Sequence, residues 1–330
     1  MPNIVSDYRA PLFLRNGHLN TIYPSLFRKL KPTMCYREQI DTQDNDFLFL
    51  DWYTLDDLSH SDLSEPKRLV IISHGLEGHS ERPYVLGMAN HLNKLGWDAL
   101  AWNFRTCGPV MNRQKRFYHS GATDDLARVI QHASERGYQQ IALVGFSMGG
   151  NLSLLHAGRE SASLNKAVIG VVGISVPCDL EGCANQLAKP QNSIYMKRFL
   201  RDLHHKMAAK QQAFPDDICI DNYQDIRNFK QFDDLYTAPL HGFKDATDYW
   251  TQSSCLQYLP DICLPTLLIN AQDDPFLSES AYPYHEADAS SMLYLETPAN
   301  GGHVGFVSFN NDGSYWIEQR VGGFLKDILK

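Results

Sequence analysis

The sequence has little of several features that would mark it as something other than an ordinary globular protein. It holds 30 lysines and arginines against 38 aspartates and glutamates, a formal net charge of −8, so it lacks the basic excess that phosphate recognition needs. Residues 1–7 lack the basic start and apolar core of a secretory signal. The longest apolar run, residues 167–174, is too short to span a bilayer. These absences argue against nucleic-acid binding, export and a membrane span.

Cysteine is present, but in no pattern that suggests a bond or a ligand set. The 7 cysteines are an odd number and include no C-x-x-C pair, which fits neither a disulfide framework nor a zinc site. The histidines and acidic residues show no metal-ligand spacing either. We therefore predict a cytoplasmic protein in a reducing compartment, with no metal and no other cofactor.

The length and composition fit one large α/β domain that carries an insertion. The chain has 330 residues, of which 43% are hydrophobic and 21% are charged. Strand and helix signals alternate along much of it, which predicts a mostly parallel sheet with helices on both faces and ligands beyond the carboxyl ends of the strands. The expected elements here are strands at 69–73, 99–103, 140–144 and 167–174 and helices at 83–95 and 123–136.

The segments before this alternation are of two kinds. Residues 1–34 are expected to form an irregular lead-in packed on the body. Two strand-like runs, 34–40 and 47–53, then flank the polar turn at 41–45, which predicts an antiparallel hairpin.

The alternation stops after residue 174. Residues 180–255 are polar, aromatic and helix-like, and we expect them to form a helical cap inserted over the active site rather than a decoration far from it. The pattern then resumes with a strand at 265–270, a helix near 278–285, a strand at 292–295 and a closing helix at 313–329. The predicted α/β core thus combines residues 35–179 with residues 256–330.

The run Gly145-Phe146-Ser147-Met148-Gly149 is typical of a nucleophile elbow, G-x-S-x-G. It follows the apolar run 140–144 and precedes the helix-like run 151–157, which is the strand and helix context that the motif requires. The bare pattern also arises by chance. In this context it predicts that Ser147 stands on a sharp turn at the edge of the sheet, beside the N-terminus of a helix.

A serine hydroxyl is a weak nucleophile and needs a histidine base that is oriented by a carboxylate. Where a nucleophile elbow carries the serine, the acid usually follows the next-to-last strand of the sheet and the histidine follows the last. Asp274 and His303 occupy those positions, after the strands expected at 265–270 and 292–295. The sequence therefore predicts a triad of Ser147, Asp274 and His303.

The identity of the acid has alternatives. Asp273 is adjacent to Asp274, and one of the two could instead cap a helix that begins near Phe276. Asp179, after the strand at 167–174, is a third candidate.

The tetrahedral intermediate of acyl transfer needs two backbone N–H donors, which together form an oxyanion hole. The residue after the nucleophile supplies one, which is Met148. The second is expected from Leu76, in the loop Ser73-His74-Gly75-Leu76-Glu77-Gly78. His74 is expected to shape this loop by hydrogen bonding.

Taken together, these residues resemble the α/β-hydrolase superfamily and, within it, the YheT-like branch of predicted hydrolases. The resemblance runs nearly end to end. It is carried by HGLEG at 74–78, NFRTCG at 103–108, YHSG at 118–121, GFSMGGN at 145–151, FDD at 232–234, TAPLHGF at 237–243, DD at 273–274 and GGHVGF at 301–306.

The resemblance implies an α/β-hydrolase fold and a triad at Ser147, Asp274 and His303. One departure is Thr106, where similar sequences tend to have glycine. We expect a serine hydrolase of carboxylic esters, a carboxylesterase that works through an acyl-enzyme on a small-molecule or lipid ester. The same triad would also serve a thioesterase, a lipase or phospholipase, or an acyltransferase, and a non-catalytic binding protein on this fold is a further alternative. No oligomeric state is predicted.

Overall fold

A nine-stranded sheet forms the centre of the molecule in the computed structural model, which describes residues 3–32, 36–54 and 66–330. The strand order is β1-β9-β8-β7-β6-β4-β5-β3-β2. The strands are β1 Asn3–Ile4, β2 Tyr36–Asp41, β3 Phe47–Tyr53, β4 Arg68–Ser73, β5 Asp98–Asn103, β6 Gln140–Phe146, β7 Val168–Ile174, β8 Thr266–Ile269 and β9 Leu293–Glu296. All neighbouring pairs from β1 to β5 are parallel, whereas β5–β3 and β3–β2 are antiparallel. The predicted mostly parallel sheet with an N-terminal antiparallel hairpin is confirmed.

The central strands are apolar throughout because both faces of the sheet are covered. In β4, Leu69 and Ile71 belong to one hydrophobic cluster, while Val70 and Ile72 belong to another. This alternation places a separate core on each face.

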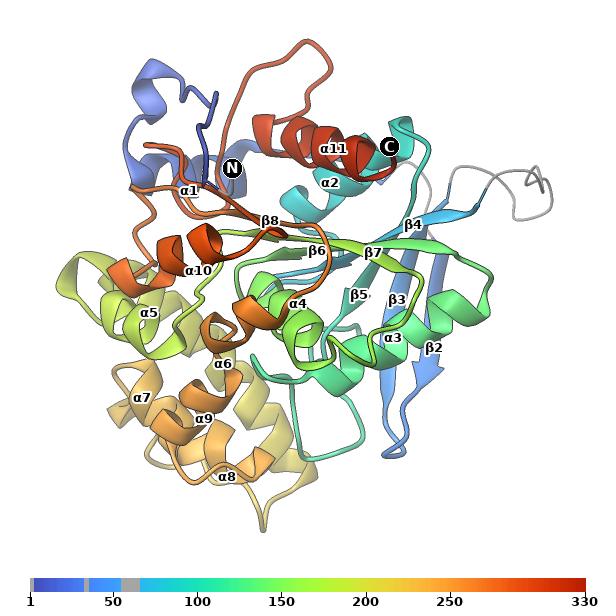
Figure 1. Cartoon of the computed structure of the whole chain (residues 1–330). Helices are drawn as coiled ribbons and strands as arrows, with labels where there is room; N and C mark the ends of the chain where they lie inside the picture. Colours follow the sequence, from blue (N-terminus) through green and yellow to red (C-terminus); the bar gives the residue numbers. More distant parts are fainter. Residues whose placement is uncertain (1–2, 33–35, 55–65) are drawn as a thin grey trace.

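Helices cover both faces of the sheet, as predicted (Figure 1). Helices α2 (Pro83–Lys94) and α11 (Trp316–Ile328) pack on one face. Helices α3 (Thr123–Glu135), α4 (Met148–Arg159) and α10 (Tyr284–Ala289) pack on the other. Helices α2, α3 and α11 begin within a few residues of their expected positions.

The chain between β7 and β8 is helical. Residues 175–265 are all described and contain no strand. The helices of this insertion are α5 Leu180–Leu187, α6 Ser193–Ala213, α7 Phe229–Phe232, α8 Ala238–His241 and α9 Ala246–Ser253. Figure 1 shows α6 to α9 grouped on one side of the sheet. We refer to residues 180–255 as the helical insertion.

The expectation of an irregular lead-in is wrong. The segment contains the helix α1 (Gly17–Phe27), the short 3₁₀ turn η1 (Leu12–Leu14) and β1, which pairs with β9 at the sheet edge. Glycine and proline inside α1, at Gly17 and Pro24, hide its helical pattern because both residues disfavour helix interiors. Residues 33–35, where the hairpin was expected to start and the core to begin, lie outside the described residues.

The prediction of a helix near 278–285 is also wrong. A short 3₁₀ turn, Glu279–Ala281, is followed by α10, which begins at Tyr284. Pro283 separates the two because proline constrains the residue before it to extended backbone and is tolerated only at a helix start.

Thr106 sits in a strained backbone position in the loop after β5. Its φ is 69°, in the left-handed region that favours glycine. Among the described residues, its buried Oγ1 has no hydrogen-bond partner. The preceding residue, Arg105, fixes the loop through salt bridges to Asp46 and Asp125, each no longer than 2.8 Å.

We expect Thr106→Gly to raise the free energy of unfolding by about 1 kcal/mol. The change relieves about 1–2 kcal/mol of backbone strain and removes an unpaired hydroxyl, and these gains exceed the roughly 0.5–1 kcal/mol of added entropy in the unfolded chain. Urea unfolding followed by circular dichroism measures it. The matched control is Asn45→Gly, at an exposed turn residue with φ of 60°, where asparagine is already tolerated. A Thr106→Gly variant that is no more stable than wild type would contradict the assignment of strain.

Candidate active site

Ser147 lies on a sharp turn between β6, which ends at Phe146, and α4, which begins at Met148. Its φ of 53° is rare for a residue with a side chain. The flanking glycines are required by close backbone contacts. A Cβ on Gly145 would lie 2.2 Å from the Gly149 carbonyl oxygen, and one on Gly149 would lie 2.4 Å from the Ser73 carbonyl oxygen. The sequence G-x-S-x-G is therefore the one that this turn can accommodate.

A continuous chain of hydrogen bonds joins Ser147, His303 and Asp274. The Ser147 Oγ is 2.9 Å from His303 Nε2, and His303 Nδ1 is 2.8 Å from Asp274 Oδ2. The Asp274 side chain is fully buried, and that of His303 is 10% exposed. Asp274 comes from the loop after β8 and His303 from the loop after β9. The structure thus brings together the three residues that the sequence singled out.

The two alternative acids have other partners. Asp273 accepts hydrogen bonds from the Gly302 N–H at 2.8 Å and from the Asn300 amide at 3.3 Å, so it holds the loop that carries His303. Burial raises the pKa of Asp273 above its ordinary value. Asp179 caps α5 by accepting from the Gly182 N–H at 3.1 Å.

The helix expected near Phe276 is absent, since residues 275–278 are described and non-helical. Asp274 Oδ1 accepts the Phe276 N–H at 2.9 Å in a local turn, so it caps no helix there.

The loop after β4 lies against Ser147. A Cβ on Gly75 would be 3.2 Å from the Ser147 Cβ. His74 fixes the loop, because its Nδ1–H donates to the Gly75 carbonyl oxygen at 2.8 Å and its Nε2 accepts the Phe104 N–H at 3.2 Å. Burial lowers the pKa of His74 to about 3, so the imidazole is neutral.

Two backbone donors of this region are free to bind a ligand. The Gly75 N–H donates to the Tyr84 hydroxyl at 3.1 Å, whereas the Leu76 and Met148 N–H groups have no hydrogen-bond partner among the described residues. Met148 is the first residue of α4, where helical N–H groups are unsatisfied.

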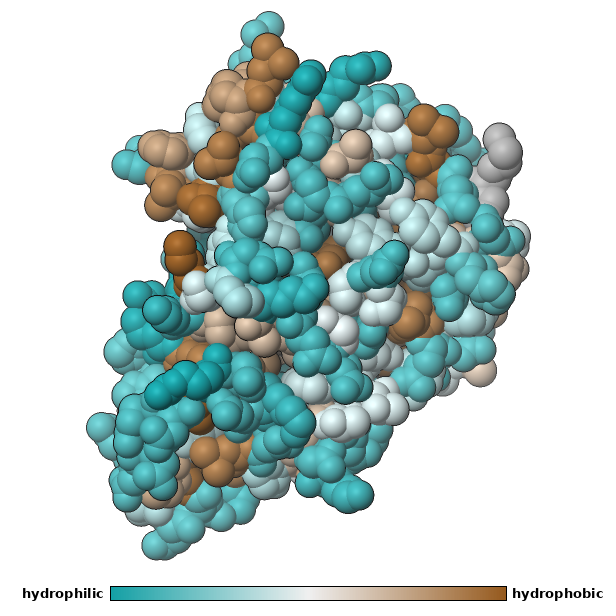
Figure 2. Space-filling view, turned by 90° about the vertical axis from the view of Figure 1, so that its left-hand side faces the viewer, coloured by the Kyte–Doolittle hydropathy of each residue, from teal (hydrophilic) through white to brown (hydrophobic). Residues whose placement is uncertain are grey.

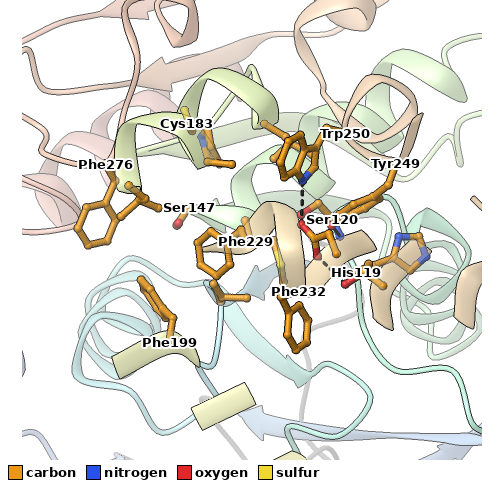
Figure 3. A pocket seen from close by; sticks show the side chains of 18 of the residues that line it. His119, Ser120, Ser147, Cys183, Phe199, Phe229, Phe232, Tyr249, Trp250 and Phe276 are labelled. Carbon is orange, nitrogen blue, oxygen red and sulfur yellow. Dashed lines mark hydrogen bonds between the residues drawn. The ribbon is translucent and has the colours of Figure 1, made fainter. Parts of the chain in front are cut away.

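A cavity of about 120 Å³ opens from Ser147 and His303 into the helical insertion. Its walls are mainly apolar and include Leu76, Leu180, Leu187, Phe199, Phe229 and Trp250. Figure 3 shows the rings of Phe199, Phe229 and Phe276 around Ser147, with Trp250 farther along the cavity. A larger groove of about 350 Å³ reaches Ser147 and His303 from the side of α1. Both the cavity and the groove therefore reach Ser147.

One carboxyl group lies in the wall of the cavity, and the sequence reasoning did not single it out. Asp233 accepts hydrogen bonds from Thr237 Oγ1 at 2.6 Å and from Trp250 Nε1 at 2.9 Å. Burial raises its pKa from 3.8 to about 7. The FDD run at 232–234 was its only signal in the sequence.

Neither a metal site nor a membrane-crossing helix is found within the described part of the chain. No three His, Cys, Asp or Glu side chains there come together in a way that could hold a metal ion. None of the helices in the same part is both long and apolar enough to cross a bilayer.

Comparison with known proteins agrees with the fold. Residues 68–309 match the family described as alpha/beta hydrolase fold. The chain therefore belongs to the α/β-hydrolase family.

Within that family the chain is YheT-like. It is 34% identical over 319 residues, 96% of this chain and 92% of the relative, to "Putative esterase YheT" of Escherichia coli (strain K12). It is 27% identical over 281 residues to "Phospholipase ABHD3" of Mus musculus, covering 84% of this chain and 68% of that protein. The esterase Pf2001 of Pyrococcus furiosus shares the fold, with a TM-score of 0.59 at 18% identity over 93% of this chain and 97% of that one. The family and the named relatives support a hydrolase.

The raised pKa of Asp233 predicts a loss of stability as the pH rises. Between about pH 4 and about pH 7 the native state holds a proton that the unfolded chain has released, so the free energy of unfolding falls by at most about 1.4 kcal/mol per pH unit. In Asp233→Asn the amide oxygen can accept the Trp250 N–H while the amide nitrogen donates to the Thr237 hydroxyl, as the neutral acid can. We expect this variant to remove the slope.

Urea unfolding at several pH values measures the slope for each protein. The control is Asp234→Asn, at the exposed neighbour that pairs with Lys230 at 2.6 Å. We expect the stability gap between Asp233→Asn and wild type to widen as the pH rises. A gap that is independent of pH would show that Asp233 is ionised in the native protein.

Proposed function

We propose that the protein is a serine hydrolase that cleaves carboxylic esters through an acyl-enzyme, as a carboxylesterase does. The observation that carries the proposal is the hydrogen-bond chain from Ser147 Oγ through His303 to Asp274, with separations of 2.9 Å and 2.8 Å. A nucleophile, a base and an orienting acid in this order are what acyl transfer to a serine needs. A binding protein on the same fold would need none of the three.

In the first half-reaction His303 Nε2 accepts the proton of Ser147 Oγ while that oxygen attacks the ester carbonyl. The carbonyl oxygen becomes an oxyanion, which the Leu76 and Met148 N–H groups stabilise together with the N-terminal end of α4. The intermediate then collapses. The proton on His303 passes to the departing alcohol, and Ser147 keeps the acyl group.

In the second half-reaction water replaces the alcohol. His303 takes a proton from the water, the hydroxide attacks the acyl carbon, and the carboxylic acid leaves as Ser147 regains its proton. Asp274 fixes the tautomer of His303 and stabilises its charged form throughout. The buried position of Asp274 supports this role, because its hydrogen bonds to His303 are shielded from water.

A lipid ester is the second candidate substrate. It is favoured by the apolar walls of the cavity beside Ser147, which suit an acyl chain, and by the phospholipase name of one relative. In this reading the helical insertion is a cap that forms the acyl pocket. Rates on p-nitrophenyl esters of increasing chain length, on an acyl-CoA and on a phospholipid separate these candidates from a thioesterase.

We also propose a cytoplasmic location. Its support is that the described cysteines, Cys107, Cys178, Cys183, Cys219, Cys255 and Cys263, are all free thiols.

Ser147→Ala is expected to lower kcat/KM on a p-nitrophenyl ester by at least about 10³-fold and to abolish labelling by a fluorophosphonate probe. Both losses follow from removal of the attacking oxygen. The control is Ser153→Ala, in α4, whose buried Oγ donates to the Gly149 carbonyl oxygen. Labelling that persists in Ser147→Ala but disappears in another serine variant would refute the proposal.

Asp274→Asn is expected to lower kcat by about 10³–10⁴-fold, because an amide favours the wrong tautomer of His303. Asp273→Asn is the matched control. It perturbs the neighbouring side chain, which bonds Gly302 and Asn300, and we expect a loss of less than about tenfold in kcat with a lower melting temperature. Steady-state kinetics and thermal unfolding measure both. Equal losses of kcat would mean that the two carboxylates share the role.

A further inference from the structure

Helix α1 has its apolar side turned outward. The residues that it buries are Gly17, Asn20 and Pro24. Those that it exposes include Leu19, Leu26 and Phe27, which are 52%, 63% and 65% exposed. An ordinary surface helix places its apolar stripe on the core and its polar residues in water. The inverted arrangement leaves an apolar face that nothing in the described protein covers.

The apolar face continues beyond the helix. Leu12, Phe13 and Phe309 are 78%, 61% and 60% exposed. Tyr23 connects them to α1, because its ring lies 6.3 Å from that of Phe13, 6.1 Å from that of Phe309 and 5.0 Å from that of Phe27. We call the set Leu12, Phe13, Leu19, Leu26, Phe27 and Phe309 the apolar rim. Figure 2 shows hydrophobic surface gathered along one upper edge of this side of the molecule, at the height of α1 in Figure 1.

The segment that carries most of the apolar rim is basic. Residues 8–32 contain Arg9, Arg15, Arg28, Lys29 and Lys31 and no acidic residue, whereas the whole chain has a net charge of −8. Arg28 is used internally, in a salt bridge to Glu318 at 2.6 Å. The other four cations are exposed. A basic, apolar surface on an acidic protein is complementary to anionic lipid headgroups with acyl chains beneath them.

The rim also borders the route to Ser147. Leu26 and the 76%-exposed Ile194 of α6 both line the groove of about 350 Å³, and the same groove reaches Ser147 and His303. An amphiphile that leaves a lipid layer at the rim would therefore enter the groove without crossing open water.

We propose that the apolar rim docks the protein on an anionic lipid surface, with the groove facing that surface. Exposed aliphatic and aromatic side chains insert among the acyl chains, and Arg9, Arg15, Lys29 and Lys31 bind the headgroups. A second copy of the chain is the poorer occupant, because a two-fold contact through this region would bring the same cations together. Docking goes beyond ester hydrolysis and requires none of the residues that hydrolysis uses.

Cosedimentation with vesicles tests the proposal. The probes are phosphatidylcholine vesicles with and without phosphatidylglycerol. We expect the wild-type protein to bind the anionic vesicles more tightly, and the double variant Leu12→Ser/Phe27→Ser to bind them at least about tenfold more weakly. Lys29→Glu/Lys31→Glu should lose the preference for phosphatidylglycerol. Neither double variant alters a residue near Ser147.

The matched control is Val110→Ser/Leu235→Ser, which removes two side chains that are 55% and 50% exposed and lie outside the rim. It should bind vesicles as the wild type does. Ser147→Ala should also bind normally, which separates a failure of the docking proposal from a failure of the proposed hydrolysis. All variants except Ser147→Ala should retain the wild-type rate on a soluble short-chain ester.

Three results would overturn the proposal. The first is a wild-type protein that does not sediment with anionic vesicles. The second is a Leu12→Ser/Phe27→Ser variant that binds as tightly as the control variant. The third is a wild-type dimer by light scattering that this rim variant converts to monomer, which would make a second copy the occupant of the rim.

Discussion

The close approach of two backbones at the ends of β4 and β6 is the constraint on which the site depends. Gly149 brings the start of α4 so near to β4 that a side chain there would overlap the Ser73 carbonyl oxygen. This approach forces Ser147 into its left-handed conformation and holds it beside the loop that carries Leu76. The strain is sustained because β6 is hydrogen-bonded to β4 on one side and to β7 on the other.

Much of this could be predicted from the sequence because parallel sheets follow simple rules. Buried parallel strands are continuously apolar, and their carboxyl ends meet at one edge, so residues that follow different strands are brought together. From these rules the sequence alone predicts that Ser147, Asp274 and His303 meet. The same rules cannot decide whether Asp273 or Asp274 is the acid. Adjacent loop residues point in different directions, and only the fold determines which carboxylate meets the histidine.

The parts that escaped prediction share a physical cause, which is that tertiary contacts outweigh local propensity. Helix α1 contains Gly17 and Pro24, which are both poor helix formers. Gly17 is needed because the start of the helix packs closely on the loop of Asp273. A Cβ on Gly17 would lie 1.9 Å from the Asp273 carbonyl oxygen. The raised pKa of Asp233 likewise depends on burial, which exists only once the helical insertion has folded. Cavity shape, which depends on how α6 lies across the site, is equally non-local.

One hydrogen bond links the loop of the candidate base, near the end of the chain, to helix α1, near its start. The His303 N–H donates to Thr21 Oγ1 at 2.8 Å, across 282 residues of sequence. In a protein synthesised from its N-terminus, this bond can form only after the last strand and the loop after it have emerged. The turn that carries Ser147 can form earlier, from β4, β6 and α4. Ser147 can thus reach its position well before His303, the group that would activate it. An incomplete chain would therefore hold a serine hydroxyl without its base.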